Sequence, residues 1–196
     1  MPAPFEIMAA PFDVYVAPVG TAFPDIAVTP AAAWLLLGAS GTKNYDEDGI
    51  TITHGQNIEI FRPVGLTAGR KAFRTEEELT IEFNLVDITV TQYARVLNQA
   101  VVTTTAAGSG TGGNLNMPLM QGLNVSMYAM LLRATGTSPY GDGWNTQLDL
   151  PMVYQSGEPA PVFKKGEPAM LETEWQAMWD STLGFGRYRA QNATAL

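Results

Sequence analysis

Two long stretches of alternating residues, Lys71 to Asp87 and Glu167 to Asp180, constrain the fold of this chain most strongly. In the first stretch one parity is largely apolar, and the other is acidic or polar. Successive side chains of a β-strand point to opposite faces, so this stretch predicts a strand with one apolar and one acidic face. The apolar set is Phe73, Leu79, Ile81, Phe83 and Leu85, and the polar set is Arg74, Glu76, Glu78, Thr80, Glu82 and Asn84.

The length of these stretches bears on assembly. A strand of about 15 residues spans about 50 Å, whereas a compact domain of this size has a radius of gyration of only about 16 Å. Such a strand bends sharply or projects, and a projecting edge leaves backbone donors and acceptors for a neighbour to satisfy. We therefore favour a structural subunit of an assembly over an enzyme.

Composition supports a subunit whose surface is partly covered. With 196 residues, we expect one domain with a real core over 1–196. Charged residues make up only 15% of the chain, well below the usual quarter, so part of the surface is expected to lie against other subunits. The net charge of −8 argues against a protein that grips nucleic acid, because phosphate binding depends on Lys and Arg. It leaves open a protein that lets nucleic acid slide past.

Residue counts exclude several classes of site. The chain has no cysteine, and His54 is its only histidine, so disulfides, thiol catalysis, cysteine zinc sites and multi-histidine metal sites are excluded. We expect no cofactor and no metal. Residues 1–10 lack the basic start and apolar run of a secretion signal, and Ala31 to Leu37 is too short to span a bilayer. We expect synthesis in the cytoplasm and no membrane insertion.

Strand patterns recur along the chain. Ile50 to His54 and Asn57 to Phe61 alternate, and Gly55 with Gln56 between them forms either a tight turn or a bulge in one longer strand. Ala106 to Asn116 is expected to be a loop of Gly, Ser, Thr and Asn. Further strands are expected at Phe12–Ala17, Trp34–Leu37, Leu123–Arg133, Gln147–Tyr154 and Pro161–Lys164.

One helix is expected, from Val90 to Asn98. Thr89 is a plausible N-cap with Gln92 three residues later, which is the spacing of a capping box. The apolar residues follow helical spacing and predict a helix packed on a sheet.

Two segments combine helix-forming residues with an alternating pattern, Thr75 to Leu79 and Glu167 to Trp179. Propensity alone predicts helices there, but the period of two favours strands. Trp175 and Trp179 share one parity of the second segment, so we expect both in the core.

Three motifs suggest chemistry without the context that chemistry needs. Gly108, Gly110 and Gly113 satisfy a dinucleotide-binding pattern, but no helix follows to hold a pyrophosphate. The run Asn44 to Gly49 matches half of a calcium loop, yet Gly55 stands where its bidentate glutamate belongs, so a turn is favoured. Carboxylates two apart on one strand face, with Cα atoms about 6.6 Å apart, resemble the acid pairs of glycoside hydrolases. Those pairs are Glu76 with Glu78 and Glu172 with Glu174.

The order of the motifs resembles the major tail tube proteins of long-tailed, non-contractile bacteriophages. The resemblance covers most of the chain, but no single motif in it is diagnostic. It runs through residues 16–21, 34–38, 46–53, the acidic strand 74–85, the helix 90–98, and then residues 163–168, 171–179 and 184–188.

The resemblance implies a mainly β fold, a β-sandwich or barrel with one flanking helix and long projecting strands. Those strands join a continuous inner barrel when subunits assemble into hexameric rings. Stacked rings form a hollow tail tube in the virion, through which DNA passes without specific binding. Its other implied partners are the tape measure protein, the tail terminator and the tail tip proteins. Glu76, Glu78 and Glu82 are the expected lumen residues, where like charge repels phosphate.

Contacts between rings are expected from three segments. These are an N-terminal arm over 1–11, the loop 38–49 and a C-terminal arm over 184–196, since lone segments gain order by docking on a neighbour. The candidate contact residues are Pro4, Phe5, Asn44, Tyr45, Asp46, Arg187 and Tyr188.

Two alternatives stay open. One is another virion β-sandwich, such as a tail terminator, a capsid decoration protein or an adhesion module. The other is an enzyme that acts on glycans through paired carboxylates, which predicts that Glu172→Gln or Glu76→Gln abolishes turnover. The tube hypothesis predicts no turnover and is therefore a non-enzymatic one.

Overall fold

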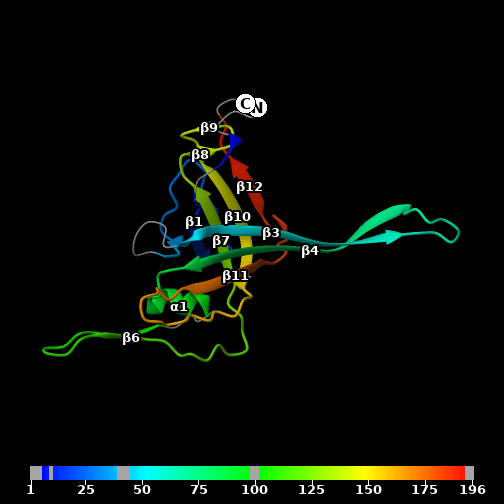
Figure 1. The fold of residues 1–196 in the computed structure, drawn as a ribbon. Coiled ribbons are helices and arrows are strands. Elements are labelled where there is room, and N and C mark those ends of the chain that lie inside the picture. The colour runs from blue at the N-terminus through cyan, green and yellow to red at the C-terminus, as the bar shows by residue number, and fades with distance from the viewer. Residues whose placement is uncertain (1–5, 9–10, 39–44, 98–101, 193–196) are drawn as a thin grey trace.

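The computed structural model describes residues 6–8, 11–38, 45–97 and 102–192. The protein is mainly β with a multi-stranded antiparallel sheet and one helix, α1, at Val90–Val96 (Figure 1). The strands of the main sheet are β1 (Asp13–Pro18), β2 (Leu35–Leu36), β3 (Tyr45–Phe61), β4 (Lys71–Leu85), β7 (Tyr128–Ala134), β10 (Thr146–Gln155), β11 (Leu171–Ala177) and β12 (Arg187–Ala190). Two small hairpins complete the fold, β5 (Thr103–Thr105) with β6 (Asn114–Asn116) and β8 (Thr137–Ser138) with β9 (Gly141–Asp142).

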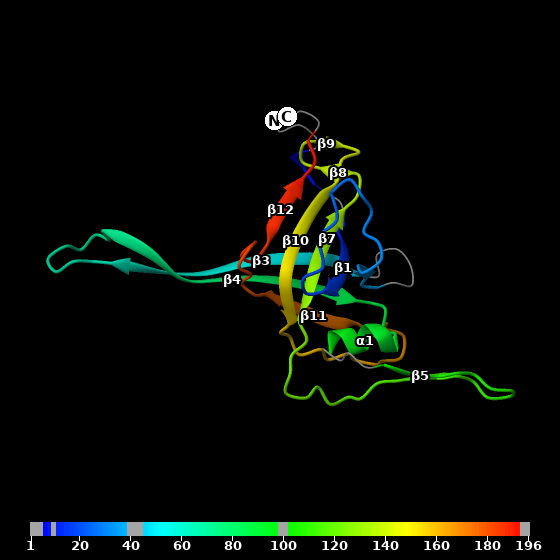
Figure 2. The same cartoon turned by 180° about the vertical axis from the view of Figure 1, so that it is seen from behind.

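The main sheet folds over at β10 into two crossed layers. Its strand order is β2-β1-β7-β10-β11-β4-β3, and β12 also pairs with β10. One edge of β10 pairs first with β12, at residues 146–149, and then with β11, at residues 153–155. The register against β7 shifts between Leu150 and Val153, and such irregularities let a strand pass from one layer to the other. In Figures 1 and 2, β3, β4 and β11 accordingly run across β1, β7 and β10.

The core fills the space between the two layers. Trp175 on β11 is fully buried, and its ring meets Tyr128 edge-on with ring centroids 6.1 Å apart. Val96 brings α1 against the same cluster. The other buried apolar residues of this cluster include Val14, Val16, Leu79, Ile81, Phe83, Leu85, Met130, Leu132, Leu150 and Leu171.

The predicted helix and its cap are confirmed. Thr89 is the N-cap, and its Oγ1 accepts a hydrogen bond from the backbone N of Gln92 at 3.3 Å. The helix ends at Val96, and Asn98 lies outside the described residues.

The first alternating stretch forms one strand, β4, as predicted, but a bulge divides it. Asn57 pairs with Glu76 and Ile58 pairs with Arg74, so Thr75 is an extra residue on β4. Beyond Thr75 the parity of β4 is therefore reversed. Phe73, expected on the apolar face, lies opposite Glu59 on the other face of the hairpin. That part of the prediction was wrong because an extra residue exchanges the two faces of a strand.

The second alternating stretch is shorter than expected. Only Leu171–Ala177 forms strand β11, and the chain then turns, with Asp180 and Gly184 exchanging two backbone hydrogen bonds of 2.9 Å. Trp175 is buried as predicted, whereas Trp179 is 69% exposed. The expectation of a buried Trp179 was wrong because parity places a side chain on a face only as far as the strand runs.

Other expected elements differ in extent. The pieces at 50–54 and 57–61 belong to the single strand β3, so the longer-strand alternative is right, with the register shift beside Asn57. The expected strand at 123–133 begins only at Tyr128, and 161–164 forms no strand apart from one bridge between Lys164 and Glu167. Of the expected loop at 106–116, residues 106–113 do form the connection between β5 and β6, whereas residues 114–116 form strand β6.

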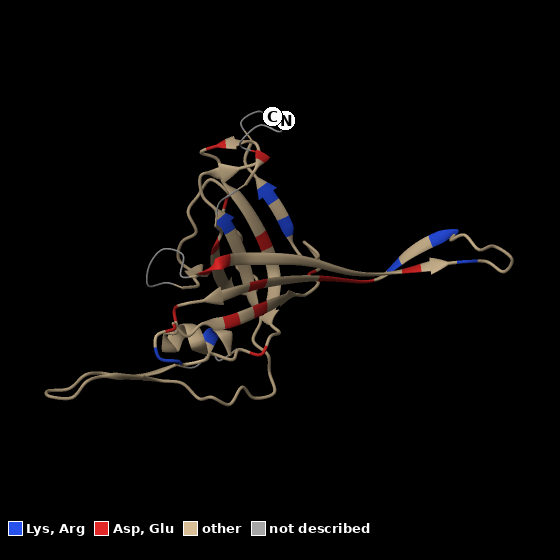
Figure 3. Cartoon of the chain, in the orientation of Figure 1, with Lys and Arg blue, Asp and Glu red and all other residues tan. Residues whose placement is uncertain are grey.

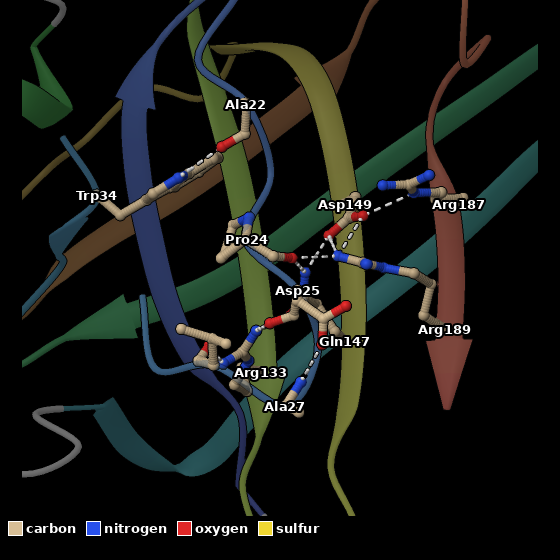
Figure 4. A network of polar contacts seen from close by, with 11 residues as sticks. Ala22, Pro24, Asp25, Ala27, Trp34, Arg133, Gln147, Asp149, Arg187 and Arg189 are labelled. Carbon is tan, nitrogen blue, oxygen red and sulfur yellow. Dashed lines mark hydrogen bonds and ion pairs between the residues drawn. The ribbon is translucent and has the colours of Figure 1, made fainter. Parts of the chain in front are cut away.

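A polar network holds the segment 22–28 against the outer side of β7, β10 and β12 (Figure 4). Arg133 donates to the backbone oxygens of Val28 and Asp25 and to the side chain of Gln147, and burial lowers the pKa of its guanidinium. The fully buried Asp149 binds Arg187 at 2.7 Å and Arg189 at 2.9 Å.

Gly186 makes this closeness possible. A Cβ at that position would lie 2.3 Å from the carbonyl oxygen of Asp149. Because glycine has no Cβ, the chain can begin β12 directly beside β10.

Candidate functional site

The β3–β4 hairpin continues well beyond the body of the molecule, and we call its projecting part the arm, residues 57–76 (Figures 1 and 2). Within the body, β4 pairs with β3 on one side and with β11 on the other, from Thr80 to Leu85. In the arm, no described strand lies beside the outer edge of either β3 or β4. Both edges therefore present unpaired backbone groups, which is the template on which a further strand adds.

The arm is exposed on both faces. On β4, residues 71–78 are all exposed, whereas residues 79–85 alternate with buried positions. Its apolar side chains are unusually open to solvent, and Val64 in the connecting loop is exposed to the full extent. The exposed apolar residues of the arm are Ile58, Ile60, Phe61, Val64, Leu66 and Phe73.

The total solvent-accessible surface of the chain is also larger than that of a compact monomer. The chain exposes 12301 Å², against about 9,000 Å² for a compact monomer of its 21.1 kDa. The excess is of the order that obligate interfaces bury, about 2,000 to 5,000 Å².

An acidic face runs along the side of β4 and β11 that faces away from the core. Glu82 on β4 lies directly opposite Glu174 on β11, and Asn84 lies opposite Glu172. Like charges directly opposite each other destabilise a sheet, so the isolated fold gains nothing from this arrangement. The loop after β10 adds Glu158, and these residues together line a shallow hollow. Figure 3 shows the acidic residues along the crossed strands.

The three expected lumen residues share this face. The pairing of β4 with β3 places Glu76 opposite Asn57, Glu78 opposite Gly55 and Glu82 opposite Thr51. Glu76 and Glu78 lie where the arm leaves the body, and Glu82 lies within the body sheet. Sequence reasoning put Glu172 and Glu174 on one strand face, but only the β4–β11 register shows that they continue the face of Glu82.

The expected contact residues fall into three groups. Pro4, Phe5 and Asn44 lie outside the described residues. Tyr45 and Asp46 are used inside the subunit. The Tyr45 hydroxyl accepts from the backbone N of Val14 at 3.0 Å and donates to the carbonyl of Leu37, and burial raises its pKa. Asp46 accepts a 2.6 Å hydrogen bond from Asn84.

Arg187 and Tyr188 lie on β12. Arg187 binds Asp149 within the chain, while Tyr188 is 54% exposed. Tyr188 is therefore the most accessible of the described contact candidates.

The remaining motifs do not converge on a reactive centre. The glycines of 108–113 lie at the tip of the β5–β6 hairpin, with a bridge between Gly108 and Thr111. Within the described ranges, no group of three or more His, Cys, Asp or Glu side chains is placed to hold a metal ion. In the same part of the chain, no helix has the length and apolar character that crossing a membrane requires.

No family model and no curated protein matches the chain. The likeness to tail tube proteins therefore stays a likeness in the order of motifs. The arm and the acidic face are the features on which a function can be argued.

Proposed function

We propose that this chain is a structural subunit that assembles into stacked rings and so forms the hollow tail tube of a long-tailed, non-contractile bacteriophage. The acidic face of β4 and β11 lines the lumen, through which DNA passes. The observation that carries the proposal is the arm, whose two open edges and exposed apolar residues serve no purpose in an isolated subunit.

Closure of a ring supplies what the arm lacks. Antiparallel strands from successive copies satisfy each other's edges, and rotation about a shared axis leaves no copy with a free edge. A ring of six copies is the arrangement that the resemblance implies. In this arrangement the projecting strands become parts of one continuous inner barrel.

The acidic face supports the lumen assignment through its charge. Glu76, Glu78, Glu82, Glu172 and Glu174 belong to two adjacent strands and one face. A wall of this charge repels phosphate across a narrow water gap, so that a duplex moves without sticking. The proposal includes no catalytic step, and in the virion the partners are the tape measure, terminator and tip proteins.

Negative-stain electron microscopy of the purified protein at rising concentration tests the assembly. We expect hollow tubes of constant width. Single rings that never stack would instead indicate a terminator, and particles that stay monomeric at every concentration, also when seeded with tail tips, would overturn the proposal. Turnover of a glycan that Glu172→Gln abolishes would support the enzyme alternative.

The lumen assignment has a test of its own. A double variant, with Glu76 and Glu82 each changed to Lys, is expected to form tubes that retain DNA in a salt-dependent way. A control with Asp142 and Glu167 changed to Lys has the same net charge, and its tubes are expected to release DNA like the parent. Equal retention by both variants would contradict the lumen assignment.

A further inference from the structure

A groove opens on the core side of the hinge between the arm and the body, along the seam between β3 and β12. These two strands are neighbours there but are not paired, because β3 ends the sheet and β12 pairs only with β10. The groove encloses about 490 Å³, within the range of pockets that hold ligands. Its apolar lining is formed by Phe12, Ile52, Leu79, Leu148, Leu150 and Phe185.

The rim of the groove is polar. The Glu77 side chain stands at the side where the arm begins, and Tyr188 and Arg187, the latter held by Asp149, stand on the opposite side, on β12. An apolar floor with a charged rim is the arrangement of a protein contact site. Nothing in the described part of the subunit fills it.

The tip of the arm has the complementary character. Val64 and Leu66, which are 107% and 52% exposed, form an apolar knob in the loop between β3 and β4. Arg62 and Arg70 flank this knob, and neither side chain has an ion pair within the described residues. Four of the eleven basic residues of the chain lie between positions 62 and 74, and Figure 3 shows them toward the tip.

The tip cannot reach the groove of its own subunit. Apart from the bulge at Thr75, the hairpin is an antiparallel ladder that pairs Phe61 with Lys71 and runs back to Gly55 and Glu78. Eight strand residues hold the tip about 25 Å from the body. Its knob is therefore available only to another molecule.

We propose that the groove receives the tip of the arm of a second copy of this chain. Val64 and Leu66 lie against the apolar floor, and Arg62 and Arg70 face Glu77 at the rim. The tip and the groove are different surfaces of one chain, so the contact is head-to-tail and propagates from copy to copy. This inference rests on the proposed self-assembly and names the surfaces that make it.

The absence of cysteine gives a clean cross-linking test. Single-cysteine variants V64C and Y188C are mixed, assembled and treated with an oxidant, and in parallel with a short bis-maleimide. We expect a covalent dimer in the mixture, because a disulfide forms only when two Cα atoms approach within about 7 Å. The matched control is V64C mixed with Y140C, since Tyr140 has the same 54% exposure as Tyr188 but lies on the β8–β9 hairpin. That mixture is expected to give no dimer.

Three results would overturn the inference. They are a dimer of V64C alone in the same yield, a dimer with Y140C in the same yield, and tubes that form while V64C and Y188C do not cross-link. The last result leaves the proposed function standing. A V64C–Y188C dimer in a sample without tubes supports the contact and counts against the tube.

A second pair of variants tests the knob without cysteine. Val64→Asp is expected to abolish assembly, because a carboxylate cannot enter the apolar floor beside Glu77. Thr67→Asp places the same charge in the same exposed loop and is expected to assemble like the parent. Because both positions are exposed, both variants should keep the circular dichroism of the parent, and equal assembly by both would contradict the inference.

Discussion

The two halves of β4 both pair with β3, but they differ in burial and in whether a second strand lies beside them. From Leu79 to Leu85 the strand lies between β3 and β11, and every second side chain is buried in the core. From Lys71 to Glu78 the same strand pairs only with β3, and every residue is exposed. The first half belongs to a folded domain, and the second half is a two-stranded ribbon in water.

The difference separates the part of the strand that stabilises the subunit from the part that meets a neighbour in the proposed assembly. Ladder hydrogen bonds contribute only about 0.5 to 1.5 kcal/mol each, and an isolated two-stranded hairpin is marginal in water. Apolar burial supplies the rest in the body, at about 25 cal/mol per Å². The arm lacks that contribution until another surface covers Ile58, Ile60 and Phe73.

The largest expected effect on stability is in the body core. Trp175→Ala should lower the free energy of unfolding by about 3 to 5 kcal/mol, because it removes a fully buried ring and leaves a cavity. Phe73→Ala in the arm should change it by no more than about 0.5 kcal/mol, since the ring is 45% exposed. Denaturant unfolding of both variants measures the contrast. A loss at Phe73 as large as that at Trp175 would show that the arm is part of the folding unit.

The next largest effect concerns ion pairs. Asp149→Ala should destabilise the subunit by about 3 kcal/mol, because Arg187 and Arg189 would lose a fully buried partner. Arg74→Ala removes the arm's ion pair with Glu77, whose atoms lie 3.5 Å apart and whose side chains are both more than half exposed. That variant should be unchanged within about 0.5 kcal/mol. The same denaturant titration checks both variants. A large loss of unfolding free energy for Arg74→Ala would contradict the expected difference between the buried and the exposed ion pair.

Removing the whole arm is expected to affect stability less than either substitution in the body. Asn57 and Glu76 are directly paired, so residues 58–75 can be replaced by an Asn-Gly turn. The free energy of unfolding should stay within about 1 kcal/mol of the parent, because the removed residues bury little and the loop becomes shorter. Tube formation should be lost in electron micrographs of the same preparation. A variant that unfolds would show that the arm is needed for the fold of the subunit. A variant that still forms tubes would show that the arm is not needed for assembly.

Several features of the fold were predictable from local sequence. Alternation in β4 outweighed the helix propensity of Glu76, Glu77 and Glu78, because a period of two fits only a strand. Thr89 and Gln92 predicted the start of α1, since capping involves neighbouring residues alone. The acidic face of β4 followed from the same parity.

Other features were hidden because they depend on residues distant in sequence. The bulge at Thr75 follows from pairing with β3 and reverses the face of Phe73. The exposure of Trp179 follows from where the chain leaves the sheet. Residues 114–116 were expected to lie in a loop because their sequence gives no apolar face, and only backbone hydrogen bonds pair them with β5.

The amino-acid sequence alone determined the long strands, the helix cap, the acidic parity and the shortage of charge, because each follows from neighbouring residues or from counts. The tertiary structure decided that Glu82 faces Glu174, that the sheet bends at β10, and that a groove opens between β3 and β12. Those features need the register between strands far apart in the chain, which no local pattern contains. The arm depends on both the local sequence and the tertiary structure. Its alternating pattern is local, but its unpaired edge on β4 follows from the end of β11 alongside Thr80.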